Sequence, residues 1–581
     1  MKPVNRTLIL LWFVIPVTLS AAAHTPFKHV IIVVQENRTP DNLFGSDAGA
    51  SNPQLPGADL AQEANCHGDW TNLTPFVLNA CFDPDHGHGW QAPEHDSWVK
   101  MYDMGLMDRA CDIYLDCTSC SNGQCPSGQI LQQTYVDNSD RNVQPYFDIA
   151  KNYGYANYMF ATNQGPSFEA HQFLFAGTSA PTPSDDTVDQ CYDSVDNEYY
   201  PCYEWFAAEL QKTPDGTFGC LAGADTNIVE ISPGPANPGP GGNEYTGIYN
   251  GGFPCYEHNT LADLLDQNDI SWKYYPQGKD PQFGLWTAPN AIKHICQPAD
   301  KQCQGPDWVK YVQPEIPPDP PVPGEMAPIL SDIQDCNLPA VSWVIPDGSW
   351  SDHAGINSDI EGPAWVAAIV NAVGNSWTQS LNGGQCDYWG STQHQSEPTA
   401  ILVVWDDWGG WYDHILPWNC QAGPNGRCQG YPNNTGNWYV YGFRVPLLAV
   451  SAYNYRPSGS SGYISGALPP YGPGEVVPYV HDFGSILNFT EYVFGLGEVD
   501  PYGYHYADYW APDAYTSGNC GPLVCPYGLS DFFDFNQSPT TFATIPLPPL
   551  LQEYTAQWFE DYGTHQGDRA PSDPDDDAIE R

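Results

Sequence analysis

Basic residues are scarce in this chain of 581 residues, which holds 19 lysines and arginines against 69 aspartates and glutamates. The formal net charge at neutral pH is therefore −50, with histidine counted as neutral. Binding nucleic acid requires a basic surface that neutralises phosphates, so this composition argues against nucleic acid as a partner. A phosphate ester remains acceptable as a substrate, provided that a bound cation supplies the local positive charge.

Long apolar runs are also rare. The first one, Leu8–Leu19, follows Lys2 and Arg6 and precedes the small residues Ala21–Ala23. It is too short to cross a bilayer comfortably, and no later stretch is long enough to do so. This pattern predicts a signal peptide over residues 1–23, a mature chain without a transmembrane segment, and a secreted or periplasmic location.

Cysteine, by contrast, is plentiful, with 18 residues. Many of them are near neighbours in the sequence: Cys66/Cys81, Cys111/Cys117/Cys120/Cys125, Cys191/Cys202, Cys296/Cys303, Cys420/Cys428 and Cys520/Cys525. An even number of cysteines in an exported chain is typical of a disulfide framework. The pair Cys117 and Cys120 has no matching second half at zinc-finger spacing, which favours structural bridges over a zinc site.

Candidate strands recur along the chain, at His29–Val34, Val341–Ile345, Ala400–Trp405 and Val445–Val450. Between them lie stretches rich in proline, glycine and cysteine, which predict long loop insertions pinned by disulfides rather than further domains. We therefore expect one catalytic domain over residues 24–540. Residues 541–581 would form a C-terminal segment that ends in a solvated acidic tail.

The most informative stretch is TAILVVWDDWGGWYDHILP, residues Thr399–Pro417. The apolar run Ala400–Trp405 predicts a strand that is buried on both faces, as in a parallel sheet covered by helices. Asp406 and Asp407 then lie at the carboxyl end of the strand, where ligands bind in open α/β sheets. Two adjacent carboxylates there either repel each other or share a cation, so a metal site is favoured over two aspartates that cap a turn.

Polar residues also follow the first expected strand, which ends in QENRTPD. A polar loop after a strand would explain this run by itself. Together with the aspartates at the end of the later strand, however, Glu36 would complete an oxygen-rich site for a divalent cation. Asp413 and His414 would add an acid and an imidazole nearby, and Gly409 lets the backbone approach the site closely.

Ser167 precedes an apolar segment, Phe168–Ala176, which is expected to be a helix that ends at Gly177. A serine at this position is commonly a plain helix cap. The functional interpretation is a nucleophile whose attack on phosphorus is assisted by the helix dipole and by backbone N–H groups.

Two segments supply histidines. His86 and His88 lie in the turn-rich stretch DPDHGHGW, and His353 follows an expected strand and precedes a helix opened by Gly362 and Pro363. Each histidine alone is more typical of a surface or hydrogen-bonded residue than of a catalyst. Their recurrence near the ends of strands is what favours a catalytic role.

Taken together, these motifs resemble the phosphoesterase family that holds bacterial non-specific phospholipases C and secreted acid phosphatases. The motifs are VVQENRTPDNLFG, DPDHGHGW, NQGPSFEAHQFLFAGTS, VSWVIPDGSWSDH with GPAWVAAIVNAVGNS, and ILVVWDDWGGWYDHILP. The resemblance implies an α/β fold, an alkaline-phosphatase-like α/β/α sandwich with a mostly parallel central sheet. It also implies metal-assisted hydrolysis of phosphate esters through a phosphoseryl intermediate.

The resemblance also implies roles for individual residues. One divalent metal ion, with Ca, Mg, Mn and Zn as candidates, would be bound by Glu36, Asp406 and Asp407, and Asn37 would touch metal or phosphate. Ser167 would be the nucleophile. His353 and one of His86 or His88, which the sequence does not separate, would contact phosphate oxygens or protonate the leaving group.

The substrate would be a phosphate ester, with a phospholipid headgroup as one candidate. Two alternatives remain at this point. One is a phosphomonoesterase of the acid phosphatase type without lipid specificity, and the other is a secreted binding protein that keeps the fold but does no chemistry.

Overall fold

A computed structural model of the chain provides the three-dimensional view. It describes residues 25–62, 134–163, 167–179, 247–276, 284–312, 328–346, 350–353, 361–380, 383–391, 394–417, 441–457, 460–467, 479–499, 506–511 and 528–548, residue 107, and short stretches within 64–78 and 190–232. His86, His88, the expected signal peptide and the expected acidic tail lie outside the described residues, so those expectations stay predictions.

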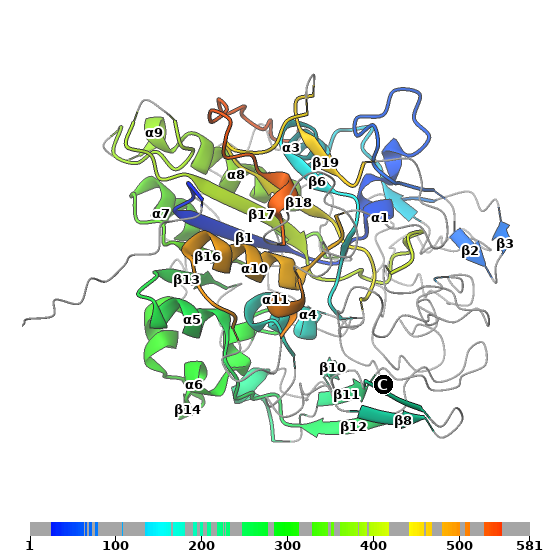
Figure 1. Cartoon of the computed structure of the whole chain (residues 1–581), viewed down its shortest axis with the longest axis vertical. Coiled ribbons are helices and arrows are strands. Elements are labelled where there is room, and N and C mark those ends of the chain that lie inside the picture. Colours follow the sequence, from blue (N-terminus) through cyan, green and yellow to red (C-terminus); the bar gives the residue numbers. More distant parts are fainter. Residues whose placement is uncertain are drawn as a thin grey trace, which may run out of the picture.

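A seven-stranded sheet forms the centre of the molecule, in the order β13, β16, β1, β17, β18, β6, β19 (Figure 1). These strands span Trp272–Tyr275, Val341–Val344, His29–Gln35, Thr399–Trp405, Leu447–Val450, Gly154–Ala156 and Tyr463–Ser465, respectively. β13, β16, β1 and β17 pair in parallel, and so do β6 and β19. β18 is antiparallel to both of its neighbours. The predicted, mostly parallel sheet is therefore confirmed.

The two central strands are buried over their whole length. Every residue of β1 (HVIIVVQ) and of β17 (TAILVVW) is buried, which explains why both read as continuous apolar runs rather than alternating ones. Their parallel register runs from His29 opposite Thr399 to Gln35 opposite Trp405. The two strands thus begin and end level with each other.

Helices cover both faces of the sheet (Figure 1). The main ones are α3 (Gln144–Asn152), α8 (Glu361–Gly374), α4 (Ser167–Ala176) and α10 (Phe483–Phe494). Tyr146 of α3 packs edge-on against Trp405, with ring centroids 5.0 Å apart, and Phe175 of α4 packs against Trp343 at 5.1 Å. Trp343 is level with Leu402 across β1, and Leu402 lies three residues before Trp405. Side chains alternate between the two faces along a strand, so Trp343 and Trp405 point to opposite faces of the sheet. α4, which packs against Trp343, and α3, which packs against Trp405, therefore cover opposite faces, as the predicted sandwich requires.

Smaller elements surround this core. The remaining helices are α1 (Pro40–Phe44), α5 (Leu261–Gln267), α6 (Lys293–Cys296), α7 (Pro328–Gln334), α9 (Ser376–Gln379) and α11 (Ala507–Trp510). Short strands form two- and three-stranded sheets: β2 (Ala64–Cys66) with β3 (Asp69–Thr71), β4 (Phe76–Leu78) with β5 (Thr134–Val136), β7 (Met159–Phe160) with β20 (His481–Asp482), β8 (Gln190–Asp193) with β9 (Glu198–Pro201), β14 (Pro298–Ala299) with β15 (Gln302–Cys303), and β10 (Phe206–Leu210), β11 (Ile228–Ser232) and β12 (Gly247–Gly252). None of the helices among the described residues has both the length and the apolar character that crossing a membrane requires.

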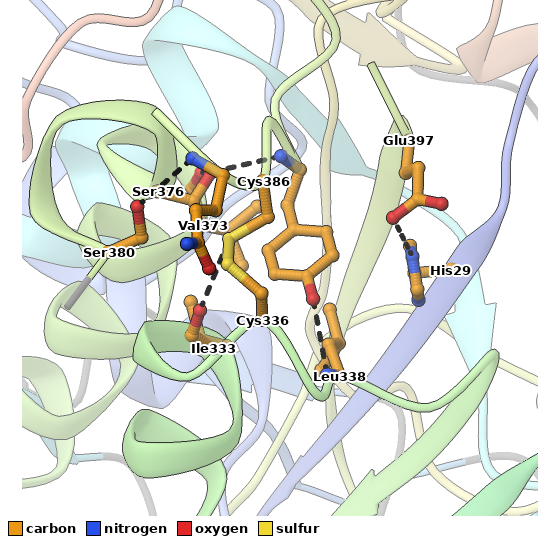
Figure 2. The surroundings of a disulfide bond; sticks show 11 residues. His29, Ile333, Cys336, Leu338, Val373, Ser376, Ser380, Cys386 and Glu397 are labelled. Carbon is orange, nitrogen blue, oxygen red and sulfur yellow. Dashed lines mark hydrogen bonds and ion pairs between the residues drawn. A yellow bond between two sulfur atoms is a disulfide. The ribbon is translucent and has the colours of Figure 1, made fainter. Parts of the chain in front are cut away.

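Disulfides join segments on the periphery, as the cysteine content predicts. The described residues contain Cys220–Cys255, Cys296–Cys303 and Cys336–Cys386, which span 35, 7 and 50 residues. Figure 2 shows Cys336–Cys386 next to Ile333 of α7 and Ser376 of α9. Cys336 precedes β16 in the chain and Cys386 precedes β17, so the bridge lies near the end of the sheet where these two strands begin.

Candidate active site

The carboxyl ends of β1 and β17 bring two predicted ligand segments together. Because Gln35 and Trp405 are partners in register, the residues after them leave the sheet side by side. The Asp406 amide donates to the Gln35 carbonyl at 2.9 Å, and the Asn37 amide donates to Asp406 Oδ1 at 3.1 Å. Glu36 is fully buried beside them. Residues almost 370 positions apart in the chain therefore share one site.

Backbone hydrogen bonds orient the two aspartates. Asp406 Oδ1 also accepts from the Asp407 amide at 2.7 Å, and Asp407 Oδ1 accepts from the Gly409 amide at 2.7 Å. A Cβ atom on Gly409 would lie 2.5 Å from Asn37 Cβ, and Gly409 has a φ of +61°. The glycine is thus required both by the turn and by the close approach to Asn37, whose own φ of 54° lies in the left-handed region.

Ser167 joins the site from the first position of α4. Its side chain is fully buried, and Oγ lies 3.0 Å from Asp407 Oδ2, 3.2 Å from Glu36 Oε2 and 3.5 Å from Asn37 Oδ1. A hydroxyl has one hydrogen to donate, and Asp407 is the nearest acceptor. The structure therefore groups the predicted nucleophile with Asn37 and the predicted carboxylate ligands.

His171 is a site residue that sequence reasoning missed. Its Nε2 atom lies 3.0 Å from Glu36 Oε1 and 3.7 Å from Asp406 Oδ2. The available signal was its spacing, because residues four apart on a helix share a face and His171 follows Ser167 by four. Glu36 thus uses one oxygen for Ser167 and the other for His171.

The donor set fits a divalent cation. Glu36, His171 and Asp406 each offer one ligand atom, and these atoms lie within 4.8 Å of one another. Asp406 Oδ2 is buried and accepts no hydrogen bond from the described residues. Burial, together with the negative charge of Asp407, raises the pKa of Asp406 to about 6. A bound cation would offset both effects, and carboxylate with imidazole is a donor combination that suits divalent metals.

The two other polar residues that were expected nearby, Asp413 and His414, belong to a separate buried group. Arg444 pairs with both oxygens of Asp413, through Nε at 2.9 Å and Nη2 at 3.0 Å. His414 bridges Asp41 through Nδ1 at 2.7 Å and Asp59 through Nε2 at 3.0 Å. Because a guanidinium already neutralises these acids, the group is an ion-pair network and does not need a metal ion.

This network clamps together the two segments that carry the site. Burial lowers the pKa of His414, but the charge of Asp41 and hydrogen bonds to Asp41 and Asp59 raise it to about 10, so the imidazole is protonated at neutral pH. The Asp41 amide donates to Asp413 Oδ2 at 3.3 Å, and Thr39 Oγ1 donates to the Tyr412 carbonyl at 2.9 Å. These contacts join the segment after Asn37 to the segment after Asp407.

The segment that carries His353 is tied to the end of β1 by a hydrogen bond of the preceding residue. The His353 amide donates to Ser351 Oγ at 3.0 Å, and its ring lies 5.6 Å from the ring of Trp286. The preceding residue is tied to the β1 end, because Gln35 Oε1 accepts from the Asp352 amide at 3.0 Å. His353 therefore lies near the edge of the sheet that carries Glu36.

Comparison with known proteins adds independent information. The model of a family described as the phosphoesterase family matches residues 27–497. "Phospholipase C B" of Mycobacterium tuberculosis is 28% identical over 477 residues, which cover 74% of this chain and 70% of that protein. "Phospholipase C A" of the same organism is 27% identical and covers 74% and 69%. "Non-hemolytic phospholipase C" of Pseudomonas aeruginosa is 25% identical over 185 residues, 29% of this chain and 22% of that protein.

Proposed function

This chain belongs to the phosphoesterase family and is a hydrolase that acts on phosphoester bonds, and from this premise we propose a metal-dependent phosphodiesterase of the phospholipase C type with Ser167 as its nucleophile. One observation carries the proposal. The buried hydroxyl of Ser167 faces the carboxylates of Glu36 and Asp407 at the carboxyl ends of two parallel strands. A serine in such a place has both a proton acceptor and a site for a cation next to it.

In the first step, Ser167 Oγ attacks phosphorus while the bond from phosphorus to the leaving alcohol breaks. The hydroxyl proton passes to Asp407 Oδ2, the acceptor 3.0 Å away. Ser167 is the first residue of α4, so the N-terminal N–H groups and the dipole of this helix favour the charge on the phosphoryl oxygens. A divalent ion bound by Glu36, Asp406, Asp407 and Asn37, with His171 as a further donor, would supply positive charge to the phosphoryl oxygens.

His353 completes the cycle as acid and then base. It donates a proton to the leaving alcohol, so that the alcohol departs neutral and Ser167 carries the phosphoryl group as an ester. Water then attacks phosphorus along the reverse path, His353 takes a proton from the water, and Ser167 departs with the proton held by Asp407. Either His86 or His88 would assist His353 by contacting the phosphoryl oxygens, as the motif resemblance implies.

The substrate class follows from charge and from the relatives. A chain with a net charge of −50 repels an anionic ester, except where a bound cation supplies local positive charge. The carboxylate-lined site would hold such a cation. The similar proteins are named phospholipases C, which favours a phosphodiester with a phospholipid headgroup over a monoester. The disulfides among the described residues support a secreted or periplasmic location.

Paired assays test this proposal. The metal-loaded enzyme is given p-nitrophenylphosphorylcholine and p-nitrophenyl phosphate under the same conditions, and then again after chelation and metal return. We expect higher kcat/KM for the diester, loss of activity with the chelator and recovery with metal. Acid quenching during turnover of the diester, followed by peptide mass spectrometry, should find phosphorylcholine on Ser167. Preference for the monoester would favour the phosphatase alternative, and turnover without a modified serine would refute the nucleophile.

A further inference from the structure

The amide, the carbonyl and one carboxylate oxygen of Asp352 form hydrogen bonds with three separate segments of the fold. Its amide donates to Gln35 Oε1 at 3.0 Å, at the end of β1, and its carbonyl accepts from Arg38 Nε at 3.1 Å. Its side-chain Oδ2 accepts from the hydroxyl of Tyr146 on α3 at 2.7 Å and from Trp405 Nε1 on β17 at 3.1 Å. Asp352 is fully buried. A buried carboxylate with this many partners fixes its own backbone firmly.

The first turn of α8 lies against the other carboxylate oxygen of Asp352, Oδ1. A Cβ atom on Gly362 would lie 2.0 Å from Asp352 Oδ1, so the helix start reaches the carboxylate only because this residue is glycine. α8 is 14 residues long, and the positive end of its dipole favours an anion there. Burial and the charge of Asp352 raise the pKa of Tyr146 well above its ordinary value, which keeps the phenol protonated as a donor.

Two hydrogen-bond partners of Asp352 flank the segment that carries two of the predicted metal ligands. Gln35 and Arg38 are the residues immediately before and after the pair Glu36 and Asn37. The same two residues bind the amide and the carbonyl of Asp352. One rigid connection therefore links the segment that holds the ligands to the residue that immediately precedes His353.

We propose that Asp352 is a positioning residue that holds His353 at the distance from the phosphoryl group which proton transfer to the leaving alcohol needs. This inference rests on the acid role proposed for His353. Asp352 itself touches neither substrate nor metal in this scheme. It acts through the backbone, because fixing its amide and carbonyl fixes the start of the next residue.

Leaving-group dependence distinguishes positioning of an acid from general support of the fold. A p-nitrophenolate departs readily as an anion and needs little protonation, whereas an alkoxide needs a proton. We therefore expect Asp352→Asn to lower kcat for an alkyl ester about 100-fold and to lower kcat for the matching p-nitrophenyl ester only a few-fold. Asparagine keeps an acceptor oxygen but turns an N–H group toward the start of α8, which disturbs the contact without leaving a cavity.

A double-mutant cycle with His353→Ala completes the test. If Asp352 acts through His353, adding Asp352→Asn to His353→Ala lowers kcat for the alkyl ester by no more than about twofold. Tyr146→Phe, which removes one donor to the carboxylate, should shift the leaving-group dependence in the same direction by a smaller factor. The matched control is Asp387→Asn. Asp387 is also buried and accepts from the Gly390 and Ser391 amides at 3.0 Å, near the opposite end of β17, and its replacement should leave kcat unchanged.

Three outcomes would overturn the inference and leave the proposed function standing. The first is an equal loss for both esters, and the second is the same loss from Asp352→Asn in the presence and absence of His353. The third is loss of bound metal from Asp352→Asn, measured by elemental analysis, which would place its effect on the ligands instead. Full activity of His353→Ala on the alkyl ester would refute the acid role in the proposed function, and the positioning role with it.

Discussion

Ser167 Oγ and Asp407 Oδ2 lie 3.0 Å apart, although 240 residues separate them in the chain. Neither residue is remarkable alone, since serines begin many helices and aspartates end many strands. Their contact exists because α4 and the end of β17 meet at one edge of the sheet. Both side chains are fully buried, so the contact is shielded from water.

Replacing Ser167 with alanine should abolish turnover and leave the fold and metal content intact. Loss of a small polar side chain at a helix start costs only about 1 kcal/mol of unfolding free energy. The measurement is kcat with metal in excess, together with thermal melting. Ser342→Ala is a matched control, because Ser342 on β16 is fully buried and its hydroxyl has no hydrogen-bond partner among the described residues. Substantial turnover by a well-folded Ser167 variant would exclude this serine as the nucleophile.

Asp406→Asn and Asp407→Asn should each weaken metal binding and lower activity in parallel. Each change removes one anionic ligand from the buried site, and titration calorimetry on the metal-free protein would show the lower affinity. Asp413→Asn is the control, since Asp413 is equally buried and lies in the same segment but pairs with Arg444. It should keep stoichiometric metal. Unchanged metal affinity in both ligand variants would contradict the assignment.

Arg444→Met should lower the free energy of unfolding by about 3–5 kcal/mol, because it leaves the buried Asp413 without its paired cation and leaves Asp41 with His414 as its paired cation. Chemical denaturation measures this difference. Lys273→Met provides the comparison, since Lys273 pairs with Asp332 at 2.9 Å but both side chains stay partly accessible to water, so removing the cation should cost less than it does at the fully buried Arg444. Equal losses in the two variants would show that the Arg444 network stabilises the fold no more than a partly buried ion pair does.

The His414 network should stabilise the fold most in mildly acidic solution. The pKa of His414 is raised to about 10 in the folded protein, so its contribution is complete below the ordinary histidine pKa of about 6.5 and disappears as the pH rises through 10. Against the raising effect of burial, the hydrogen bond and charge of His414 lower the pKa of Asp59 to about 2, so its contribution is complete above the ordinary value and is lost as the pH falls through 2. The other charged groups that face His414 are Arg444, Asp41 and Asp413.

The corresponding experiment compares the unfolding free energies of the wild type and His414→Asn by chemical denaturation at a series of pH values from about 5 to about 10. The difference in unfolding free energy should shrink as the pH rises. His294→Gln is the comparison variant, because His294 also loses its proton within this pH range. Hydrogen bonds and charges from Asp263 and Glu257 overcome the effect of burial and raise the pKa of His294 to about 9. A difference that stays constant with pH would show that His414 contributes only by packing.

The sequence by itself determined the central strands and the family to which the motifs at their ends belong. Continuous apolar runs without alternation indicate strands buried on both faces, which is what β1 and β17 are. Polar residues directly after such strands must lie at one edge of a parallel sheet. For that reason Glu36, Asp406 and Asp407 could be named as a group, and the serine at the start of the apolar helix could be added from its motif.

Only the tertiary structure decided which side chains meet across the chain. His171 reaches Glu36 because of the way α4 is rotated about its axis, which local spacing leaves open. Asp413 and His414 belong to a separate ion-pair network, because Arg444 pairs with Asp413 and His414 pairs with Asp41 and Asp59. Asp352 gathers partners from β1, α3 and β17. Periodicity is a property of neighbouring residues, whereas each of these contacts depends on how separate elements pack, and a single sequence carries no direct measure of that.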